Sequence, residues 1–194
     1  DQPRSRGLGD VYKRQVTVLG QHTKRPDVVL YVNGIAFATI ELKRSYVGVS
    51  EGIRQTLGNQ DKQFIRPFFS TVQLVFAGND VEGLRYGVID TPEKYWLAWK
   101  EPSDVVGPLD RALLQLCSKD RFLTLIHDFT VFDAGVRKTA RHNQFFGVTA
   151  AQERIAKREG GIIWHTQGSG KSLTMVWLAK WIRENQDDAR VLLI

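Results

Sequence analysis

Three side chains near the start of the chain have the types and the spacing needed for metal-dependent chemistry on a phosphodiester. Asp27 follows a proline, and Glu41 and Lys43 flank Leu42 further along. Two carboxylates can share a Mg²⁺ ion, which prefers oxygen ligands and keeps several of its waters. A lysine beside the ion can orient or deprotonate a water, or stabilise the charge on a phosphate. The competing interpretation is that all three are surface charges at strand ends, which is the usual role of such residues.

A β-hairpin is the element that must bring these side chains together. The β-rich runs 28–31 and 35–40 flank Asn33-Gly34, which is a strong short-range hairpin signal. Because side chains alternate along a strand, Glu41 and Lys43 share one face and Leu42 faces the other. Whether Asp27 joins them depends on the turn.

Two turns are compatible with this hairpin, and they place Asp27 differently. A strict two-residue loop pairs Asp27 with Ile40, which puts Glu41 on the wrong face. A three-residue loop over 32–34, with its glycine left-handed in a bulge, pairs Asp27 with Thr39. Glu41 is then a diagonal neighbour on the same face, about 7–8 Å from Asp27 between Cα atoms, which suits two carboxylates on one Mg²⁺ ion. We predict the bulged turn.

A helix over 52–69 is predicted after the hairpin, because apolar residues recur there among basic and amide side chains. Pro67 is expected to end or kink this helix. Gln55 stands early in the helix and could face the same cleft as Glu41 and Lys43.

Short strands surround this helix in the predicted fold. They span residues 16–19, 71–77 and 84–89. The segment 101–108 is predicted to be a loop and 109–116 a short amphipathic helix, whereas the apolar segment 121–132 fits a helix or a strand. These elements predict a strand-rich α/β layer with one crossing helix.

The most specific pattern lies near the end of the sequence, in the run HTQGSGKS over 165–172. A short apolar strand is predicted over 161–164 before this run, and a helix after it. Strand, glycine loop and helix form the context of a phosphate-binding P-loop, in which backbone N–H groups cradle phosphate oxygens at the helix N-terminus. A further parallel strand is predicted over 189–194. A chance glycine-rich turn is the alternative interpretation.

The residue types of this loop match the roles that a nucleotide requires. Lys171 reaches the β- and γ-phosphates, and the Ser172 hydroxyl takes a coordination place on Mg²⁺. Gly168 and Gly170 leave room for the backbone to approach the nucleotide. One departure is that His165 stands where the strict pattern has glycine. The predicted nucleotide-binding residues are Thr166, Gln167, Gly168, Ser169, Gly170, Lys171 and Ser172.

The composition describes an ordinary globular protein and excludes several other classes. Of the 194 residues, 42% are hydrophobic and 25% are charged, which is typical of a folded domain. One cysteine, Cys117, excludes a disulfide framework and fits a reducing cytoplasm. No apolar run reaches the ~18 residues of a membrane span, and no signal-peptide pattern opens the chain. The net charge of +6 permits nucleic-acid binding without requiring it.

Residues 1–15 do not resemble the start of a domain. They lack apolar periodicity, and the run DVYKRQ is what a sequencing-library adaptor would read if translated. We expect an assembly scar there, and a disordered basic tail is the alternative. The stretch carries four Lys or Arg and two Asp, so its removal lowers the net charge from +6 to +4.

Taken together, these motifs resemble a known family. Pro26-Asp27 followed by Glu41-Leu42-Lys43 resembles the PD-(D/E)xK nuclease signature. The order RPDVVLYVNG, ELK, QTLGNQ, RYG, WKE and IIWHTQGSGKS is similar to the R (motor and endonuclease) subunit of type I restriction-modification enzymes. The resemblance covers nearly everything from Gln15 to Ile194.

The resemblance implies an α/β fold in two parts. Residues 16–120 would form a restriction-endonuclease-like domain, 121–140 a connector, and 141–194 the start of a RecA-like, superfamily-2 helicase motor domain with its Walker A loop. The implied activity is ATP-dependent translocation of double-stranded DNA followed by Mg²⁺-dependent cleavage in the cytoplasm. The implied partners are DNA and the methylation and specificity subunits of the restriction complex. No membrane association is implied.

The resemblance also assigns roles to individual residues. Asp27, Glu41 and Lys43 take the catalytic positions, with Asp27 and Glu41 as metal ligands. Gln55 matches the glutamine of the family's QxxxY motif, but Asn59 stands where tyrosine is usual. Gln144 matches the glutamine of a short motif upstream of the P-loop that is thought to read adenine, and Gln152 is a second candidate for that role.

Several parts of the family pattern are missing, so alternatives stay open. The upstream nuclease acid would fall within 1–15, and the DExH box and the second motor lobe would lie beyond Ile194. We therefore expect this chain alone neither to hydrolyse ATP efficiently nor to translocate. The alternatives are another nuclease–helicase fusion of repair or defence, and an NTP-binding module that binds DNA without cutting it.

Overall fold

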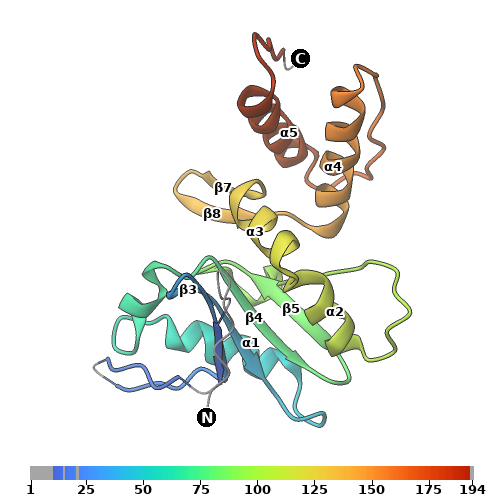
Figure 1. Cartoon of the computed structure of the whole chain (residues 1–194). Coiled ribbons are helices and arrows are strands. Elements are labelled where there is room, and N and C mark those ends of the chain that lie inside the picture. Colours follow the sequence, from blue (N-terminus) through green and yellow to red (C-terminus); the bar gives the residue numbers. More distant parts are fainter. Residues whose placement is uncertain (1–10, 15, 21, 193–194) are drawn as a thin grey trace. The chain divides into compact units, whose positions relative to one another are not determined.

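The computed structural model describes residues 11–14, 16–20 and 22–192, and the side chains of 16–20 and 22–192. The chain divides into two compact units, Asp1–Ser118 and Lys119–Ile194, each of which is described by itself (Figure 1). No helix within the described residues combines the length and the apolar character that crossing a bilayer requires.

The described residues of the first unit build one mixed sheet of six strands. The strands follow one another in space in their chain order, and only the β3–β4 pair is parallel. Their bounds are β1 Val11–Arg14, β2 Val28–Val32, β3 Ile35–Leu42, β4 Leu74–Asn79, β5 Gly83–Gly87 and β6 Leu97–Ala98. Because parallel neighbours need a crossover, the chain leaves β3, passes through a helix and returns along β4.

The start of the chain differs from the sequence-based expectation. Residues 1–10 and 15 lie outside the described residues, but Val11–Arg14 form β1 and pair antiparallel with β2. These four residues therefore belong to the sheet, although the prediction had left them out of the fold. The predicted strand over 16–19 is wrong, because only an isolated bridge joins Val18 to Lys24.

Two helices cover opposite faces of this sheet. α1, Val49–Asn59, packs against β3 and β4, and a Cβ on its Gly52 would lie 3.2 Å from the Cβ of Ala77. α2, Pro108–Leu116, packs on β5, and a Cβ on Gly78 would lie 3.0 Å from a methyl of Leu109. Since neighbouring residues of a strand face opposite ways, the two helices lie on different faces (Figure 1). Val29, Val49, Ile53, Val75 and Ala77 are among the buried side chains of the core on the α1 side.

The predicted helix over 52–69 is wrong in its second half. α1 begins three residues earlier, at Val49, and ends at Asn59, directly after Gly58. Pro67 stands instead in the first turn of a 3₁₀ helix, η1 Arg66–Ser70, where its missing N–H leaves no bond unmade.

The predicted strands 71–77 and 84–89 correspond to β4 and β5, and the helix 109–116 to α2. A short 3₁₀ helix, η2 Glu93–Tyr95, precedes β6.

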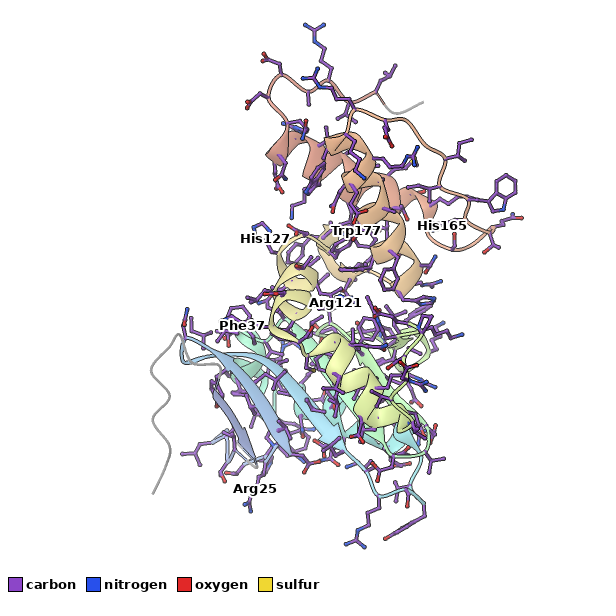
Figure 2. All side chains as sticks on the ribbon, turned by 45° about the vertical axis from the view of Figure 1, so that its right-hand side comes forward. Arg25, Phe37, Arg121, His127, His165 and Trp177 are labelled. Atoms are coloured by element: carbon purple, nitrogen blue, oxygen red, sulfur yellow. The ribbon has the colours of Figure 1, made fainter. Side chains whose placement is uncertain are left out.

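The second unit combines helices with one hairpin. Its elements are α3 Lys119–His127, β7 Thr130–Asp133, β8 Val136–Thr139, α4 His142–Ala156 and α5 Lys171–Asn185. The segment predicted as a connector, 121–140, thus forms most of α3 and a β-hairpin. The ring of Phe129 lies 4.6 Å from that of Phe145 and 6.1 Å from that of Trp177, the residue labelled on α5 in Figure 2. These three rings form the centre of the unit.

The strand predicted over 161–164 is not formed. Within the described part of the chain this segment has no ladder partner, and Ile162 and Trp164 are 92% and 89% exposed. The strand predicted over 189–194 is likewise not formed in its described residues, 189–192. An apolar run becomes a strand only when a neighbour satisfies its backbone groups, and neither segment pairs with the other here. The predicted parallel sheet around the glycine loop is therefore wrong for the described residues.

Candidate active site

The hairpin of β2 and β3 turns through two residues. Asn33 and Gly34 have φ values of 50° and 81°, and Val32 pairs with Ile35 across them. Two positive φ values in a two-residue loop define a type I′ turn, which asparagine followed by glycine favours. The predicted three-residue loop, with Tyr31 opposite Ile35, is therefore wrong.

A bulge nevertheless occurs in this hairpin, within the ladder rather than in the turn. Tyr31 pairs with Ala36 but Leu30 pairs with Ala38, so Phe37 is the extra residue (labelled in Figure 2). The carbonyl of Phe37 accepts a hydrogen bond from the N–H of Gln73, 2.7 Å away, at the start of the β3–β4 pairing. Beyond the bulge Val28 pairs with Ile40, so the same register places Asp27 opposite Glu41.

Asp27 and Glu41 are consequently on one face, as predicted, although a different bulge places them there. Asp27 directly precedes β2, and its Oδ2 accepts a hydrogen bond of 2.9 Å from the backbone N–H of Leu42. This bond ties the carboxylate of Asp27 to the backbone beside Glu41. The side chain of Leu42 itself points away, since it neighbours Glu41 on the strand.

Glu41, Lys43 and Gln55 form one contact chain on the α1 side of the sheet. Glu41 is 3% exposed, and the Nζ of Lys43 donates to its Oε1 over 3.0 Å. The same Nζ donates to Oε1 of Gln55 over 2.5 Å. The strand supplies the acid and the amine, and α1 supplies the amide. The three predicted side chains are therefore brought together, and Asp27 lies next to them.

Burial gives Glu41 an unusual acidity. Removal of its carboxylate from water, with a smaller effect from the nearby charge of Asp27, raises its pKa from 4.5 to about 7. The ammonium of Lys43 acts in the opposite sense and lowers the pKa, but it does not outweigh burial. A group with this acidity can hold or release a proton near neutral pH.

Asp27 and Glu41 are the oxygen donors that could hold a divalent cation here. The nearby charge of Asp27 disfavours the charged form of Glu41, and a cation between the two carboxylates would offset that effect. Among the described residues, no group of three or more His, Cys, Asp and Glu side chains is arranged to hold a metal ion. Two carboxylates with waters in the remaining places are a donor set that fits Mg²⁺.

Gly52 lets α1 approach the strand, and it was not among the predicted site residues. A Cβ at Gly52 would lie 3.2 Å from the Cβ of Ala77 and 3.4 Å from the Cγ of Lys43. A glycine in a helix interior lowers the stability of the helix, so its presence in the predicted helix is a signal in the sequence that another element packs closely there. Asn59, where the family pattern has tyrosine, is buried at the end of α1, and its carbonyl accepts from the N–H of Ile65.

The glycine loop precedes α5 in the second unit. Gly168 and Gly170 have φ values of 77° and 86°, and the helix begins at Lys171. The Nζ of Lys171 donates to the carbonyl of His165, 3.2 Å away (His165 is labelled in Figure 2), while Ser172 is exposed. The Oγ of Ser169 donates to the carbonyl of Thr166 over 2.7 Å. The loop and the helix N-terminus are thus present, but the strand before them is not.

Gln144 lies against this loop. Its Oε1 accepts from the N–H of Arg141, the residue before α4, over 2.8 Å, and its Nε2 donates to the carbonyl of Gly170 over 2.9 Å. A Cβ at Gly170 would lie 2.3 Å from that nitrogen, so only glycine leaves the space. The contact joins the predicted adenine-reading residue to the predicted phosphate loop through the protein's own backbone.

Two family models match the chain. Residues 11–94 match the N terminus of type I restriction enzyme R proteins, HSDR_N, and residues 143–194 match the SWI2/SNF2 ATPase family. The first match contains Asp27, Glu41, Lys43 and Gln55. The second contains Gln144 and the glycine loop.

Endonuclease subunits of type I restriction enzymes are similar to the chain over most of its length. Two come from Methanocaldococcus jannaschii: the protein named as the MjaIXP subunit is 27% identical over 81% of this chain and 18% of its own, and that named as MjaVIIIP is 28% identical over 87% and 18%. The HindI subunit of Haemophilus influenzae is 25% identical over 79% and 16%. The chain spans less than a fifth of the length of these relatives.

Proposed function

Because the chain is a relative of the endonuclease subunits of type I restriction enzymes, we propose that it supplies such a subunit with its DNA-cleaving domain and the start of its ATP-driven motor. The intact protein would be an ATP-dependent type I site-specific deoxyribonuclease. It would translocate double-stranded DNA and cleave it, together with methylation and specificity subunits, in the cytoplasm. The observation that carries the proposal is the joint position of Asp27, Glu41, Lys43 and Gln55 at one end of β3.

Each of these four groups has a distinct role in the proposed cleavage. Asp27 and Glu41 hold Mg²⁺, which when bound lowers the pKa of a coordinated water and neutralises charge on the phosphate. Lys43 places a positive charge beside the position that the scissile phosphate would take. Gln55 accepts one hydrogen bond from that ammonium and so limits its direction.

The second unit is proposed to bind ATP. The loop Thr166, Gln167, Gly168, Ser169, Gly170, Lys171 and Ser172 would receive the phosphates of ATP, with Ser172 on its Mg²⁺. Gln144 would read the adenine. Hydrolysis also needs a water-positioning acid and usually an arginine from a second lobe, so this chain by itself is expected to show no efficient turnover.

Plasmid cleavage by the full-length protein, assembled with its methylation and specificity subunits, tests the proposal. Asp27→Ala and Lys43→Ala should each abolish Mg²⁺- and ATP-dependent cleavage of supercoiled DNA while DNA binding persists. Lys62→Ala removes an exposed lysine of the same unit and serves as the control that should cleave normally.

Other results favour the other functions. Unchanged cleavage in both variants would remove the assigned site. DNA binding with no cleavage by the unaltered protein would favour an NTP-binding module that does not cut. Cleavage that proceeds without methylation and specificity subunits would favour another nuclease–helicase fusion. Robust ATP turnover by this chain alone, in a steady-state assay with DNA, would contradict the expected need for a second lobe.

A further inference from the structure

We infer that Asn79, the last residue of β4, and Glu82, in the turn that follows, are positioning residues that set where Lys43 and Gln55 meet. The inference rests on the proposed nuclease function, because it assigns these residues to the support of that site. Within the described part of the chain, neither residue forms a hydrogen bond with Asp27, Glu41 or Lys43. Their effect would pass through the connection 43–48 and through α1.

Asn79 joins the turn to that connection. Its side chain is 1% exposed, and its Nδ2 donates to the carbonyl of Val47 over 2.8 Å. Its Oδ1 accepts from the backbone N–H groups of Val81 and Glu82 over 3.0 and 2.6 Å. One buried amide therefore organises the turn through its oxygen and holds the connection through its nitrogen.

Glu82 completes the start of α1. The residue before the helix is Gly48, and no local side chain caps the helix. The Oε1 of Glu82 instead accepts from the N–H of Val49 over 2.9 Å and lies 3.4 Å from the Nδ2 of Asn79. A carboxylate at a helix N-terminus satisfies a free donor and also interacts favourably with the helix dipole. The cap of α1 thus comes from the turn after β4.

A backbone bond adds a third attachment. The N–H of Lys43 donates to the carbonyl of Gly78 over 2.9 Å. Residues 78, 79 and 82 therefore hold the chain at positions 43, 47 and 49, on both sides of the exposed stretch 44–46. Gln55 belongs to α1, the helix that Glu82 caps, and Lys43 is bonded to Gly78 of β4. The end of β4 and the turn after it therefore fix the ammonium of Lys43 and the amide of Gln55 relative to β4. The contact between Lys43 and Gln55 follows from this arrangement.

Two conservative substitutions separate this role from simple packing. Asn79→Asp keeps the acceptor for the N–H groups of Val81 and Glu82 but replaces the donor with a second acceptor, so the bonds to the carbonyl of Val47 and to the carboxylate of Glu82 are both lost. Glu82→Ala removes the cap at an exposed position that should not prevent folding. Glu82→Gln keeps the acceptor for Val49 and is the expected rescue. Gln73→Glu, at the other end of β4, controls for added charge.

The experiment measures amide hydrogen exchange and cleavage kinetics in the full-length protein. Asn79→Asp and Glu82→Ala should speed exchange in residues 44–57 while β4 and β5 stay protected. Their kcat for DNA cleavage should fall by about tenfold to a hundredfold, with KM for DNA unchanged, because misplaced groups affect the reaction more than binding. Glu82→Gln and Gln73→Glu should match the unaltered protein in both measurements.

Three results would overturn the inference. The first is unchanged exchange of residues 44–57 in Asn79→Asp and Glu82→Ala. The second is faster exchange in these variants with an unchanged kcat. The third is an equal loss of kcat in Gln73→Glu. If the unaltered protein itself does not cleave DNA, the proposed function fails, and the exchange of residues 44–57 alone then decides whether Asn79 and Glu82 hold α1.

Discussion

The ammonium of Lys43 lies between the carboxylate of Glu41, 3.0 Å away, and the amide oxygen of Gln55, 2.5 Å away, so one strand and one helix share a single cation. Because burial outweighs the ammonium and raises the pKa of Glu41, the free energy of unfolding should depend on pH.

The stability of the first unit should fall as pH rises towards neutrality. The pKa of Glu41 is about 7 in the folded protein and about 4.5 in the unfolded chain, so the folded state binds more protons between these values. The stabilisation is fully present below pH 4.5 and is lost as pH rises through 7, by an amount on the order of 3 kcal/mol. Urea unfolding of the unaltered protein and of Glu41→Gln, from pH 4 to 8 without divalent cations, measures the difference.

Two controls make the pH experiment specific. Glu51→Gln changes an exposed carboxyl of α1 and should leave the pH dependence as it was. Addition of Mg²⁺ at pH 8 should restore stability to the unaltered protein but not to Glu41→Gln, because a bound cation favours the charged carboxylate. Parallel pH profiles for the unaltered protein and Glu41→Gln would contradict the assignment.

Two glycines of α1 should respond oppositely to alanine. At Gly52 a Cβ would meet Ala77 at 3.2 Å, so Gly52→Ala should destabilise the unit by about 1–3 kcal/mol and displace α1 from Lys43. At Gly58 the added Cβ would meet no described atom within 4 Å apart from the adjoining residues and backbone of its own helix, so Gly58→Ala should stabilise the unit by about 0.4–1 kcal/mol. Thermal unfolding of both variants checks the prediction, and a stabilised Gly52→Ala variant would refute the close approach.

The two left-handed glycines of the loop should also differ. Alanine at Gly168 meets only backbone strain, whereas alanine at Gly170 would also push into the Nε2 of Gln144. Gly170→Ala should therefore weaken ATP binding and the second unit more than Gly168→Ala does. The double variant Gly170→Ala with Gln144→Ala should recover part of the lost stability, because it removes the side chain that the added Cβ meets. Additive effects in calorimetry and thermal unfolding would exclude the coupling.

Trp164 should report that residues 161–164 are not part of a sheet in this chain. Its side chain is 89% exposed, whereas Trp96, Trp99 and Trp177 are buried. Iodide should quench a distinct fraction of the tryptophan fluorescence, and Trp164→Phe should remove that fraction. Quenching that is unchanged in Trp164→Phe would mean that the segment is covered.

The hairpin and the shared face of Glu41 and Lys43 could be predicted from the sequence because the signals for them are local. Asn33-Gly34 specifies the turn, and the alternation from Glu41 to Lys43 specifies their shared face. The bulge at Phe37 carries no such signal: nothing in its residue type marks it, and the neighbouring strand, through Gln73, contributes to its place. The prediction of one face for Asp27 and Glu41 was right although its register was wrong.

The errors elsewhere arose from long-range causes. α1 stops at Asn59 although apolar residues continue, because the following residues pack as turns and a 3₁₀ helix. The run 161–164 has the composition of a strand, but a strand exists only with a partner, which the described chain does not provide. The cap from Glu82 to Val49 joins residues far apart in the sequence, so no local pattern could reveal it.

The short span from Leu42 to Val49 governs how this domain can be spliced or redesigned. It leads out of β3 and into the crossing helix, and the turn after β4 holds it at several points. An added residue there would move the helix that carries Gln55, even with every reactive side chain left in place. The same insertion at the exposed tip, Asn33-Gly34, would only lengthen a solvent-facing loop. The number of residues in this span is therefore a constraint on grafting that inspection of the acids alone would not reveal.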